Sequence, residues 1–367
     1  MRKMHVPFAS PEKLIDNEQI EAVARVLKSG QYIIGENVEA FEREFAGYIG
    51  TRYAVAVSSG TTALHLALLA HGIGPGDEVV TVPNSFIATS NAILYVGAKP
   101  VFADVDSEIH NIDPSKLKEK VSSKTKAIIP VHLYGHSADM DPISDLAEER
   151  GLRVIEDACQ AHGATYKAKK VGSLGDVGCF SFYPSKNLFV GTDGGMITTN
   201  NEETAEKLRM LRNYGQAKKY EHPILGYNFR PSEISSAIGR VNLKRLDDWN
   251  EKRRRIAHTY SQLLHDTVTI PVEKKWAKHV YHVYVIKTER RDALNEYLKS
   301  VGITCIIHYP IPIHLQRFYM EMFGFHEGMF PATEKLARVV LSIPMHPALT
   351  SDQVEYVTEK INSFFKK

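Results

Sequence analysis

Between residues 53 and 200 the chain alternates short apolar runs with longer amphipathic ones, and this alternation constrains the fold more than any other feature. Each short run is rich in Val, Ile and Ala, which is typical of a buried strand. The runs between them place Leu and Ala at helical spacing. The strand-like runs are 53–58, 77–83, 99–105, 124–133, 153–158, 177–183 and 194–200. Repeated strand–helix–strand units predict an α/β fold in which helices cover both faces of a mostly parallel sheet.

A long helix is expected to follow this part of the chain. It should run from residue 232 to about residue 264, because Pro231 precedes it and helices often begin just after a proline. The basic run at residues 252–255 falls inside this helix. We interpret that run as a solvated helix face and not as a nucleic-acid patch, because acidic residues nearby balance its charge.

The last third of the chain predicts a second, smaller α/β unit. Its expected elements are a strand at 282–288 and helices at 290–303 and 350–365. A chain of 367 residues is long enough for about two domains. We place the boundary near residue 250, which gives a large domain over residues 1–250, including the N-terminal segment, and a small domain over residues 251–367.

Composition and charge exclude several classes of protein. The formal net charge is +2, which argues against a nucleic-acid partner. No stretch approaches the roughly 18 apolar residues of a membrane helix, and the N-terminus lacks the apolar run of a signal peptide. The three cysteines, Cys159, Cys179 and Cys305, lack metal-ligand spacing. We therefore expect a cytoplasmic protein with no membrane partner, no disulfide and no metal.

Two segments beside predicted strand ends can contact a phosphorylated, planar ligand. Residues 58–64 form a small-residue turn into a helix, whose N-terminus presents unpaired N–H groups and the positive end of the helix dipole. Gly60 lets the backbone approach an anion, and the hydroxyls of Thr61 and Thr62 can donate to it, although a capped helix without ligand is an equal alternative. Phe86 begins the next helix, where its ring can stack on a ligand or belong to the core.

The run at 153–158 ends in two adjacent carboxylates, Glu156 and Asp157. Neighbouring side chains of a strand point to opposite faces, so one acid can face a ligand while the other faces away. A carboxylate at a buried strand end is costly unless it meets a cation or hydrogen-bond donors. Gln160 and His162 follow at the same strand end and can hydrogen-bond a ligand. We interpret this cluster as part of a ligand site, with a structural role open for each residue taken alone.

Lys186 lies between the strand-like run at 177–183 and a glycine-rich loop. Most lysines are solvated surface groups, but partial desolvation lowers the pKa of a lysine and frees its amine to form an imine. An anion site, a stacking ring, a strand-end carboxylate and an imine-forming lysine are the parts that hold pyridoxal phosphate. The residues therefore predict a site for this cofactor. The chain has neither a GxGxxG nor a GxxxxGK[ST] motif, which argues against nicotinamide-dependent oxidoreductases and ATPases.

These motifs occur together in one known family. Over essentially its whole length the chain resembles the DegT/DnrJ/EryC1 sugar aminotransferases, which have the aspartate-aminotransferase fold, fold type I of pyridoxal-phosphate enzymes. The resemblance implies a large domain with a mostly parallel, seven-stranded sheet and a smaller C-terminal domain. The motifs that carry it are SSGTTALHLAL, PVHLYGHSADM, EDACQAHGA, SFYPSKNL, GTDGG, GYNFRPSEISSAIG and HYPIPIHLQ.

The resemblance also implies a role for each matching residue. Lys186 would form the imine with the cofactor and later carry the proton between cofactor and substrate. Asp157 would pair with the pyridine nitrogen, and His162 would lie near the sugar. The other cofactor contacts implied are Gly60, Thr61 and Ser181 at the phosphate, Phe86 and Gln160 at the ring, and Asn228 at the phosphate of the neighbouring subunit.

Three further residues, Arg230, His308 and Tyr309, resemble the substrate-binding residues of the family, and they too would be supplied across a dimer interface. Each active site would then be built from two chains of a homodimer, and a monomer would be inactive. Two positions depart from the family pattern. His136 stands where glutamine is common, and Phe189 stands where glycine is frequent, which would change how the loop after Lys186 packs.

The implied activity is transfer of an amino group from L-glutamate to a nucleotide-linked keto-sugar, with dTDP or UDP as the nucleotide. Relatives with histidine at the imine position dehydrate sugars, so Lys186 favours transamination. HYPIPIHLQ resembles enzymes that aminate C3, whereas NFRPSEISSAIG resembles the C4 group, and we favour C3. A C4 aminotransferase acting on an NDP-4-keto-6-deoxysugar and an aminotransferase for cyclitols of the scyllo-inosose type stay open. A non-catalytic regulatory protein would require the loss of Lys186 or Asp157.

Overall fold

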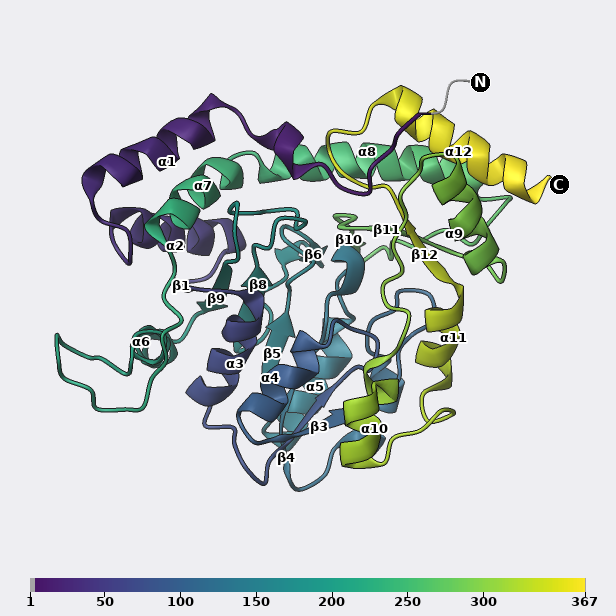
Figure 1. Cartoon of the computed structure of the whole chain (residues 1–367). Coiled ribbons are helices and arrows are strands. Elements are labelled where there is room, and N and C mark those ends of the chain that lie inside the picture. The colour runs from purple at the N-terminus through teal and green to yellow at the C-terminus, as the bar shows by residue number, and fades with distance from the viewer. Residues whose placement is uncertain (1–3, 367) are drawn as a thin grey trace.

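The computed structural model describes residues 4–366, and a seven-stranded sheet lies at its centre (Figure 1). Its strands, from one edge to the other, are β1 (Tyr53–Val57), β9 (Gly195–Thr199), β8 (Val177–Ser181), β5 (Arg153–Asp157), β4 (Thr125–Ile128), β2 (Glu78–Thr81) and β3 (Lys99–Phe102). From β8 to β3 all neighbouring strands are parallel, while β9 is antiparallel to both of its neighbours. The predicted α/β fold with a mostly parallel sheet is confirmed.

Apolar side chains on both faces of this sheet explain why its strands read as continuous hydrophobic runs. In β1, Val55 and Val57 pack with the helices of one face, whereas Ala54 and Ala56 pack with Phe41 and Phe45 on the other. The first face is covered by α3 (Gly60–Ala70), α4 (Ala88–Tyr95) and α6 (Glu202–Leu211), and the second by α2 (Glu36–Ile49) and α5 (Met140–Arg150).

The last third of the chain builds a smaller layered unit beside the central sheet (Figure 1). Its two strands, β11 (Tyr284–Lys287) and β12 (Val340–Ile343), are antiparallel. The helices of this part are α9 (Arg291–Ser300), α10 (Arg317–Phe323), α11 (Pro331–Val339) and α12 (Ser351–Phe365). Near the N-terminus, Val6 pairs with Ile303 and belongs to the same apolar cluster as this unit.

The remaining elements are short or lie at the periphery. Helix α1 (Asn17–Ser29) packs against α7 (Glu233–Leu243), and one small sheet joins β10 (Ala277–Lys278), β6 (Thr165–Tyr166) and β7 (Lys169–Lys170). The 3-10 turns are η1 (Pro11–Leu14), η2 (Pro114–Lys116), η3 (Lys118–Lys120), η4 (Leu133–Gly135) and η5 (Ile313–Leu315). Among the helices of residues 4–366, none is long and apolar enough to cross a membrane.

The single long helix expected from residue 232 onward is wrong, because the segment forms two helices, α7 (Glu233–Leu243) and α8 (Leu246–Leu264). Asn242 lies at the break and is fully buried. Its side chain accepts a hydrogen bond from Gln19 (2.9 Å) and donates one to the carbonyl oxygen of Phe189 (2.9 Å). The backbone tightens to a three-residue hydrogen bond there, from Arg245 N to Asn242 O (3.0 Å), and the chain changes direction. The domain boundary expected near residue 250 falls inside α8 and stays a prediction.

The basic run at 252–255 is only in part a solvated face, which corrects the sequence interpretation. Arg253 is buried, with 4% of its surface exposed, and its guanidinium donates to the carbonyl oxygens of Tyr281, His282 and Met345. Charge balance in the sequence could not reveal that Arg253 is buried. Its partners are backbone carbonyl oxygens, which every residue has, so the sequence does not show which of them bind it. Arg253 fastens α8 to the segments that precede β11 and follow β12.

The two departures from the family pattern both have a packing explanation. His136 donates from Nδ1 to the carbonyl oxygen of Ser137 (2.7 Å) and accepts at Nε2 from the N–H of Lys274 (3.1 Å). It therefore joins the sheet loops to the later part of the chain. The ring of Phe189 is buried and stacks on Trp249, with ring centroids 5.8 Å apart.

Candidate active site

A pocket of about 490 Å³ lies at the carboxyl ends of the parallel strands. Such ends are where open α/β sheets bind ligands, because the loops that follow the strands converge there. Asp157 reaches the pocket from the end of β5, Lys186 from the loop after β8, Gly60 from the start of α3, and Phe86 from the segment before α4. Residues spread over more than 120 positions of the sequence therefore share one wall.

The N-terminus of α3 forms the anion-binding end of the pocket. The Ser59 hydroxyl caps the helix by accepting a hydrogen bond from the N–H of Thr62 (3.1 Å). The Thr62 hydroxyl in turn donates to the carbonyl oxygen of Ser59. Its proton is therefore engaged within the cap, and Thr62 is not the ligand donor considered from the sequence. The N–H groups of Gly60 and Thr61 belong to the first turn and have no partner within the helix. A Cβ on Gly60 would lie 2.6 Å from Cβ of Ser181, so only glycine allows this approach.

Asp157 presents its carboxylate at the end of β5, where only 5% of its surface is exposed. Oδ2 accepts from the hydroxyl of Thr89 (2.8 Å), and Oδ1 accepts from the N–H of Cys159 (3.2 Å). Two donors do not saturate the lone pairs of a buried carboxylate. The carboxylate can therefore still bind one cationic N–H group in the pocket.

Lys186 lies in a turn closed by its own N–H, which donates to the carbonyl oxygen of Tyr183 (2.8 Å). Burial lowers the pKa of the Lys186 amine below its ordinary value, while the nearby thiol of Cys159 and the carboxylate of Asp157 act in the opposite direction. Within residues 4–366 its amine forms neither a hydrogen bond nor an ion pair. An amine in this environment is more readily deprotonated than a surface lysine and can attack a carbonyl carbon.

Gln160, His308 and Tyr309 also line the pocket and contact one another or the loops around it. Gln160 accepts from the N–H of Tyr134 (2.9 Å) and donates to the hydroxyl of Tyr309 (3.0 Å). The ring of Tyr309 also lies 6.0 Å from the ring of Phe86, measured between centroids. His308 is held by the hydroxyl of Ser342 (2.8 Å), and burial lowers the pKa of its ring to about 4.

The expectation that His308 and Tyr309 come from a partner subunit is wrong. Both residues line the pocket of the same chain as Lys186. The segment between α9 and α10 turns back over the large sheet, and the hydroxyl of Tyr134 fixes it there by donating to the carbonyl oxygen of His308. A sequence pattern does not show whether such a segment folds back or crosses to a neighbour.

The structure does not bring His162 into the pocket, contrary to the expectation that it lies near a sugar. Its side chain is fully buried, and its ring packs against Phe180 and Phe182. Neither ring nitrogen has a hydrogen-bond partner among the described residues, and burial lowers the pKa of the ring to about 3. His162 therefore behaves as an apolar core residue in this geometry.

Asn228 and Arg230 also lie outside this pocket. Asn228 is exposed, and its Oδ1 accepts from Nε of Arg230 (3.0 Å), whose guanidinium lies over the ring of Tyr214. Both residues lie in the long loop between α6 and α7, part of which projects from the body in Figure 1. Arg230 is half-buried, and the expectation that the two residues serve a neighbouring subunit stays a prediction.

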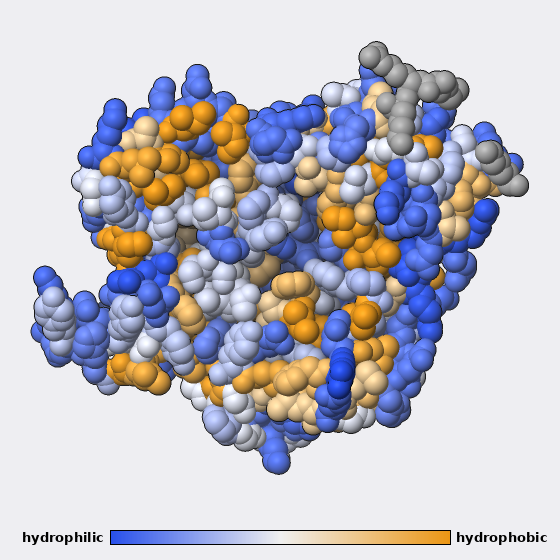
Figure 2. All heavy atoms as spheres, in the orientation of Figure 1, coloured by the Kyte–Doolittle hydropathy of each residue, from blue (hydrophilic) through white to orange (hydrophobic). Residues whose placement is uncertain are grey.

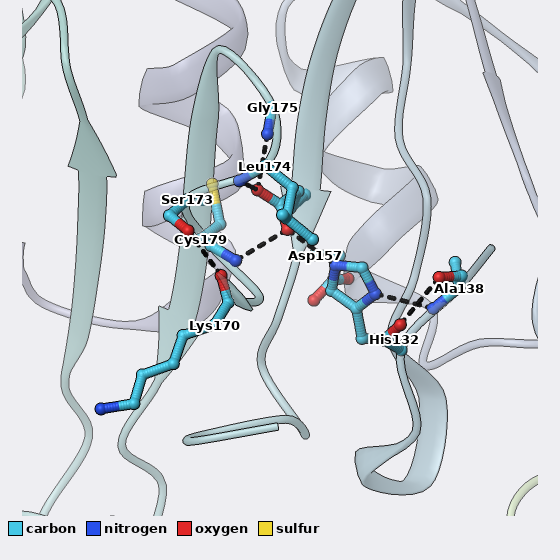
Figure 3. A network of polar contacts seen from close by, with 12 residues as sticks. His132, Ala138, Asp157, Lys170, Ser173, Leu174, Gly175 and Cys179 are labelled. Atoms are coloured by element: carbon cyan, nitrogen blue, oxygen red, sulfur yellow. Dashed lines mark hydrogen bonds and ion pairs between the residues drawn. The ribbon is translucent and has the colours of Figure 1, made fainter. Parts of the chain in front are cut away.

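The second acid of the strand end, Glu156, points to the opposite face of β5, as the alternation of strand side chains predicts. It is fully buried and accepts four hydrogen bonds, from the N–H groups of Gly172, Leu174 and Gly175 and from Nε2 of His132 (2.7–3.0 Å). Figure 3 shows this network around the labelled Leu174, Gly175 and His132. Glu156 is thus a structural anchor, and Asp157 alone faces the pocket.

Several pocket residues escaped the sequence analysis. Thr89 orients Asp157, and Asp193 and Tyr183 also line the pocket, with 53% of the Tyr183 surface exposed. His282 enters from the segment before β11. No motif marks His282, because it is more than 90 residues from Lys186 and only the fold brings the two together.

The arrangement fits pyridoxal phosphate as the expected cofactor. The N–H groups of the first turn of α3 have no partner within the helix, the carboxylate of Asp157 has acceptor capacity left, and the amine of Lys186 has a lowered pKa. These three features lie around one pocket and match the three chemical requirements of the cofactor.

Comparison with known proteins supports the same class. Residues 13–362 match the DegT/DnrJ/EryC1/StrS aminotransferase family. The chain is 45% identical to a pleiotropic regulatory protein of Geobacillus stearothermophilus, over 95% of both chains. It is also 45% identical to dTDP-3-amino-3,6-dideoxy-alpha-D-galactopyranose transaminase of Aneurinibacillus thermoaerophilus, over 94% of both chains.

The fold agrees with a solved structure at comparable similarity. The crystal structure of S. venezuelae DesV in complex with a ketimine intermediate superposes with a TM-score of 0.97 at 41% identity, and the match covers 99% of both chains. Sequence and fold thus agree over almost the entire length. The chain belongs to the DegT/DnrJ/EryC1/StrS aminotransferase family and is an enzyme of the sugar-aminotransferase class.

Proposed function

We propose that this enzyme transfers an amino group from L-glutamate to C3 of a nucleotide-linked keto-sugar, with pyridoxal phosphate held at Lys186. One observation carries the proposal: Lys186, Asp157 and the N-terminus of α3 surround a single pocket of about 490 Å³. The choice of C3 and of a dTDP-linked sugar is supported by the similarity to the A. thermoaerophilus transaminase, whose name specifies a dTDP-linked sugar with an amino group at position 3. The cytoplasm is the proposed location.

The residues divide the work of such a reaction among them. When bound, pyridoxal phosphate supplies an electron sink that lets a C–H bond beside an amine break. The N–H groups of Gly60 and Thr61 bind the phosphate, with the hydroxyl of Ser181 alongside. The Asp157 carboxylate holds a proton on the ring nitrogen, which strengthens the sink. Nζ of Lys186 would take the proton from the substrate carbon that bears the amine nitrogen and return it to the cofactor carbon on the other side of that nitrogen.

The aromatic rings and the polar side chains of the pocket orient the reacting groups. Phe86 has 56% of its surface exposed, which leaves its ring free to stack on a planar ligand. Gln160 and Tyr309, joined by their hydrogen bond, present a polar edge to that ligand. His308 faces the same space and is the proposed contact for the sugar.

We propose further that the active unit is a homodimer in which Asn228 and Arg230 of each chain complete the site of the other. The exposure of Phe86 and Tyr183 at the pocket supports this, because a second subunit would cover these rings. The projecting loop supports it as well, because Tyr220 and Leu225 expose more than 80% of their surface there. A closed two-fold pair is the natural geometry for such reciprocal contributions.

A spectral titration tests the proposal directly. The purified enzyme, supplied with pyridoxal phosphate, should show a visible-edge absorbance band that L-glutamate shifts and one keto-sugar restores. The panel should contain dTDP- and UDP-linked 3-keto and 4-keto sugars together with scyllo-inosose, and NMR of the product fixes the aminated carbon. Restoration by a 4-keto sugar or by the cyclitol alone would reject C3, and absence of any band with added cofactor would reject the site.

A further inference from the structure

A chain of side-chain hydrogen bonds ends on the carboxylate of Asp157. The hydroxyl of Thr89 donates to Oδ2 of Asp157 (2.8 Å), and the hydroxyl oxygens of Ser85 and Thr89 are 2.8 Å apart. All three residues are buried, and all three line the pocket. The chain of hydroxyls therefore lies directly beside the space that a ligand would occupy and is largely shielded from bulk water.

The protons of this chain all point toward Asp157. A hydroxyl group has one proton to donate. Thr89 gives its proton to Asp157, so in the contact between the two hydroxyls Ser85 must be the donor and Thr89 the acceptor. Oδ1 of Asp157 accepts from the N–H of Cys159 (3.2 Å). Asp157 is the acceptor in both of its contacts, which leaves its other lone pairs for a donor in the pocket.

The hydroxyl of Thr89 is held on a rigid element. Thr89 belongs to the first turn of α4, and its N–H donates to the carbonyl oxygen of Phe86 (3.1 Å). In the same helix Asn91 accepts at Oδ1 from the hydroxyl of Tyr319 (2.8 Å), which ties α4 to α10. A threonine side chain in a helix has few accessible rotamers, and the hydrogen bond from Ser85 stabilises the one observed here. The donor oxygen therefore has a fixed position.

The carboxylate of Asp157 has no such restriction of its own. The torsion that turns an Asp carboxylate is broad and roughly two-fold, so rotamer preference does not select its orientation. The hydrogen bond from Thr89 is the shorter of the two that hold it, at 2.8 Å against 3.2 Å for the bond from Cys159. The orientation of the carboxylate toward the pocket thus depends mainly on Thr89.

We propose that Ser85 and Thr89 are positioning residues, whose hydroxyls hold the carboxylate of Asp157 in the orientation that keeps a proton on the ring nitrogen of pyridoxal phosphate. This inference rests on the proposed function, in which Asp157 pairs with that nitrogen, and adds two residues that act through Asp157. An ion pair with a hydrogen bond weakens steeply when its geometry is poor, so orientation matters here. Residues 85–89 then serve the cofactor ring twice, since Phe86 lies in the same segment.

Four substitutions separate this role from a general contribution to stability. Thr89→Val keeps the branched side chain and removes the donor to Asp157. Thr89→Ser keeps the hydroxyl, and Ser85→Ala removes only the first bond of the chain. Thr81→Val is the matched control. Thr81 of β2 is also buried and lies outside the pocket, and its hydroxyl donates to the carbonyl oxygen of Ile129 (2.9 Å).

The first measurement is the protonation of the cofactor ring nitrogen. Each full-length protein is loaded with pyridoxal phosphate that is ¹⁵N-labelled at this nitrogen, and the ¹⁵N chemical shift distinguishes the protonated from the neutral form. The proposal expects a protonated nitrogen in the wild type, in Thr89→Ser and in Thr81→Val. The signal should move toward the neutral form in Thr89→Val and, to a smaller extent, in Ser85→Ala. An unchanged signal in Thr89→Val, or an equal change in Thr81→Val, would overturn the proposal.

The affinity for the cofactor is a second readout, measured by equilibrium dialysis, with circular dichroism as the check on folding. A hydrogen bond to a charged group contributes enough that Thr89→Val should raise the Kd of pyridoxal phosphate by about tenfold. Thr89→Ser and Thr81→Val should stay within about twofold of the wild type, and Ser85→Ala should fall between. A larger effect of Ser85→Ala than of Thr89→Val would contradict the order of the chain.

A third measurement needs no cofactor. Crystal structures of the cofactor-free wild type, Thr89→Val and Thr81→Val are compared at Asp157. In Thr89→Val the carboxylate should turn by more than about 30° or occupy two orientations, and in Thr81→Val it should stay as it is. One unchanged orientation in Thr89→Val would rule out the positioning role.

These outcomes are distinguishable from those of the proposed function, because none of the three measurements requires a sugar or an amino donor. A ring nitrogen that responds to Thr89→Val, in an enzyme that aminates no keto-sugar, would keep the positioning role and reject the proposed function. Normal transamination by the wild type, together with an unchanged ring nitrogen and an unchanged Asp157 in Thr89→Val, would do the opposite.

Discussion

At the scale of single residues, Lys186 illustrates how the environment sets chemistry. Its Nζ lies at the end of a turn held by Tyr183, in a pocket whose burial lowers the pKa of the amine. The same residue type at position 170 donates to a backbone carbonyl oxygen and lies over the ring of Tyr48. Location, and not residue type, decides which of the two amines is available for chemistry.

The substitution Lys186→Ala should abolish transamination while leaving the fold intact. Activity should fall by about a thousandfold or more, because both the covalent link to the cofactor and the proton carrier disappear. The measurement is the rate of the glutamate half-reaction, with circular dichroism as the check on folding. Lys170→Ala is the matched control, since that lysine is also partly buried but lies outside the pocket, and its activity should be retained.

His162 gives a prediction of the opposite kind. The variant His162→Leu should keep its activity and lose part of its acid sensitivity. The pKa of about 3 in the folded state lies below the ordinary 6.5, so between these values the unfolded chain binds more protons and stability falls as the pH drops. At pH 5 this ring should cost on the order of 2 kcal/mol, which the leucine removes.

Denaturant unfolding at pH 7 and pH 5 measures this difference. The exposed His265→Leu serves as the control and should leave the pH dependence as it is. A well-folded His162→Leu without activity would return His162 to the substrate site, as the sequence analysis expected.

At the scale of elements, β5 joins two different tasks at its carboxyl end. Asp157 faces the pocket, while Glu156 on the other face fixes the loop at residues 172–175 and the ring of His132 (Figure 3). His132 accepts at Nδ1 from the N–H of Ala138 (3.0 Å), so its Nε2 must donate to Glu156. The strand is thereby locked in the position that presents Asp157.

Glu156→Gln should therefore destabilise the protein strongly. Four donors converge on this carboxylate, and an amide places an NH₂ group against some of them, leaving buried N–H groups without an acceptor. The loss should be about 3 kcal/mol. Chemical denaturation measures it, with Glu149→Gln, an exposed residue of α5, as the neutral control. A loss below about 0.5 kcal/mol in Glu156→Gln would contradict the anchoring role.

At the scale of the whole molecule, the surface suggests where other molecules bind. Figure 2 shows apolar areas over α1 and over the region of α4 and α10. Exposed residues of these areas are Ile20 and Leu27 in α1, and Tyr95, Phe318 and Met322 around α4 and α10. The projecting loop between α6 and α7 carries Asn228 and Arg230 at its end, outside the pocket of its own chain.

Subunit mixing tests whether two chains share each site. Asn228→Ala should weaken retention of the cofactor, and Lys186→Ala should be inactive. If sites are shared, a heterodimer of the two variants contains one site with both native residues. After full exchange, half of the dimers are mixed and half of their sites are native, so activity should recover to about a quarter of the wild-type value. Native mass spectrometry verifies the exchange, and no recovery after verified exchange would contradict sharing.

Local patterns along the chain are enough to predict the layered α/β fold and the part of the pocket formed by Gly60, Asp157 and Lys186. Strands that are buried on both faces, and the helices between them, can be recognised from the periodicity of their apolar residues. Small residues at the start of a helix are a second signal that can be read from the sequence. Gly60, Asp157 and Lys186 each lie at the end of a strand-like run or at the start of a helix, so local motifs in the sequence reveal them. The opposite faces of Glu156 and Asp157 also followed from strand geometry alone.

The other features depend on contacts between distant parts of the chain, so they become visible only once the chain is folded. Asn242 breaks the expected long helix because Gln19 and Phe189 meet it there, and Arg253 is buried because three carbonyl oxygens surround it. His308 and His282 reach the pocket only after the last third of the chain folds over the first sheet. A linear pattern encodes which face of an element is apolar, but not which distant element will lie against it.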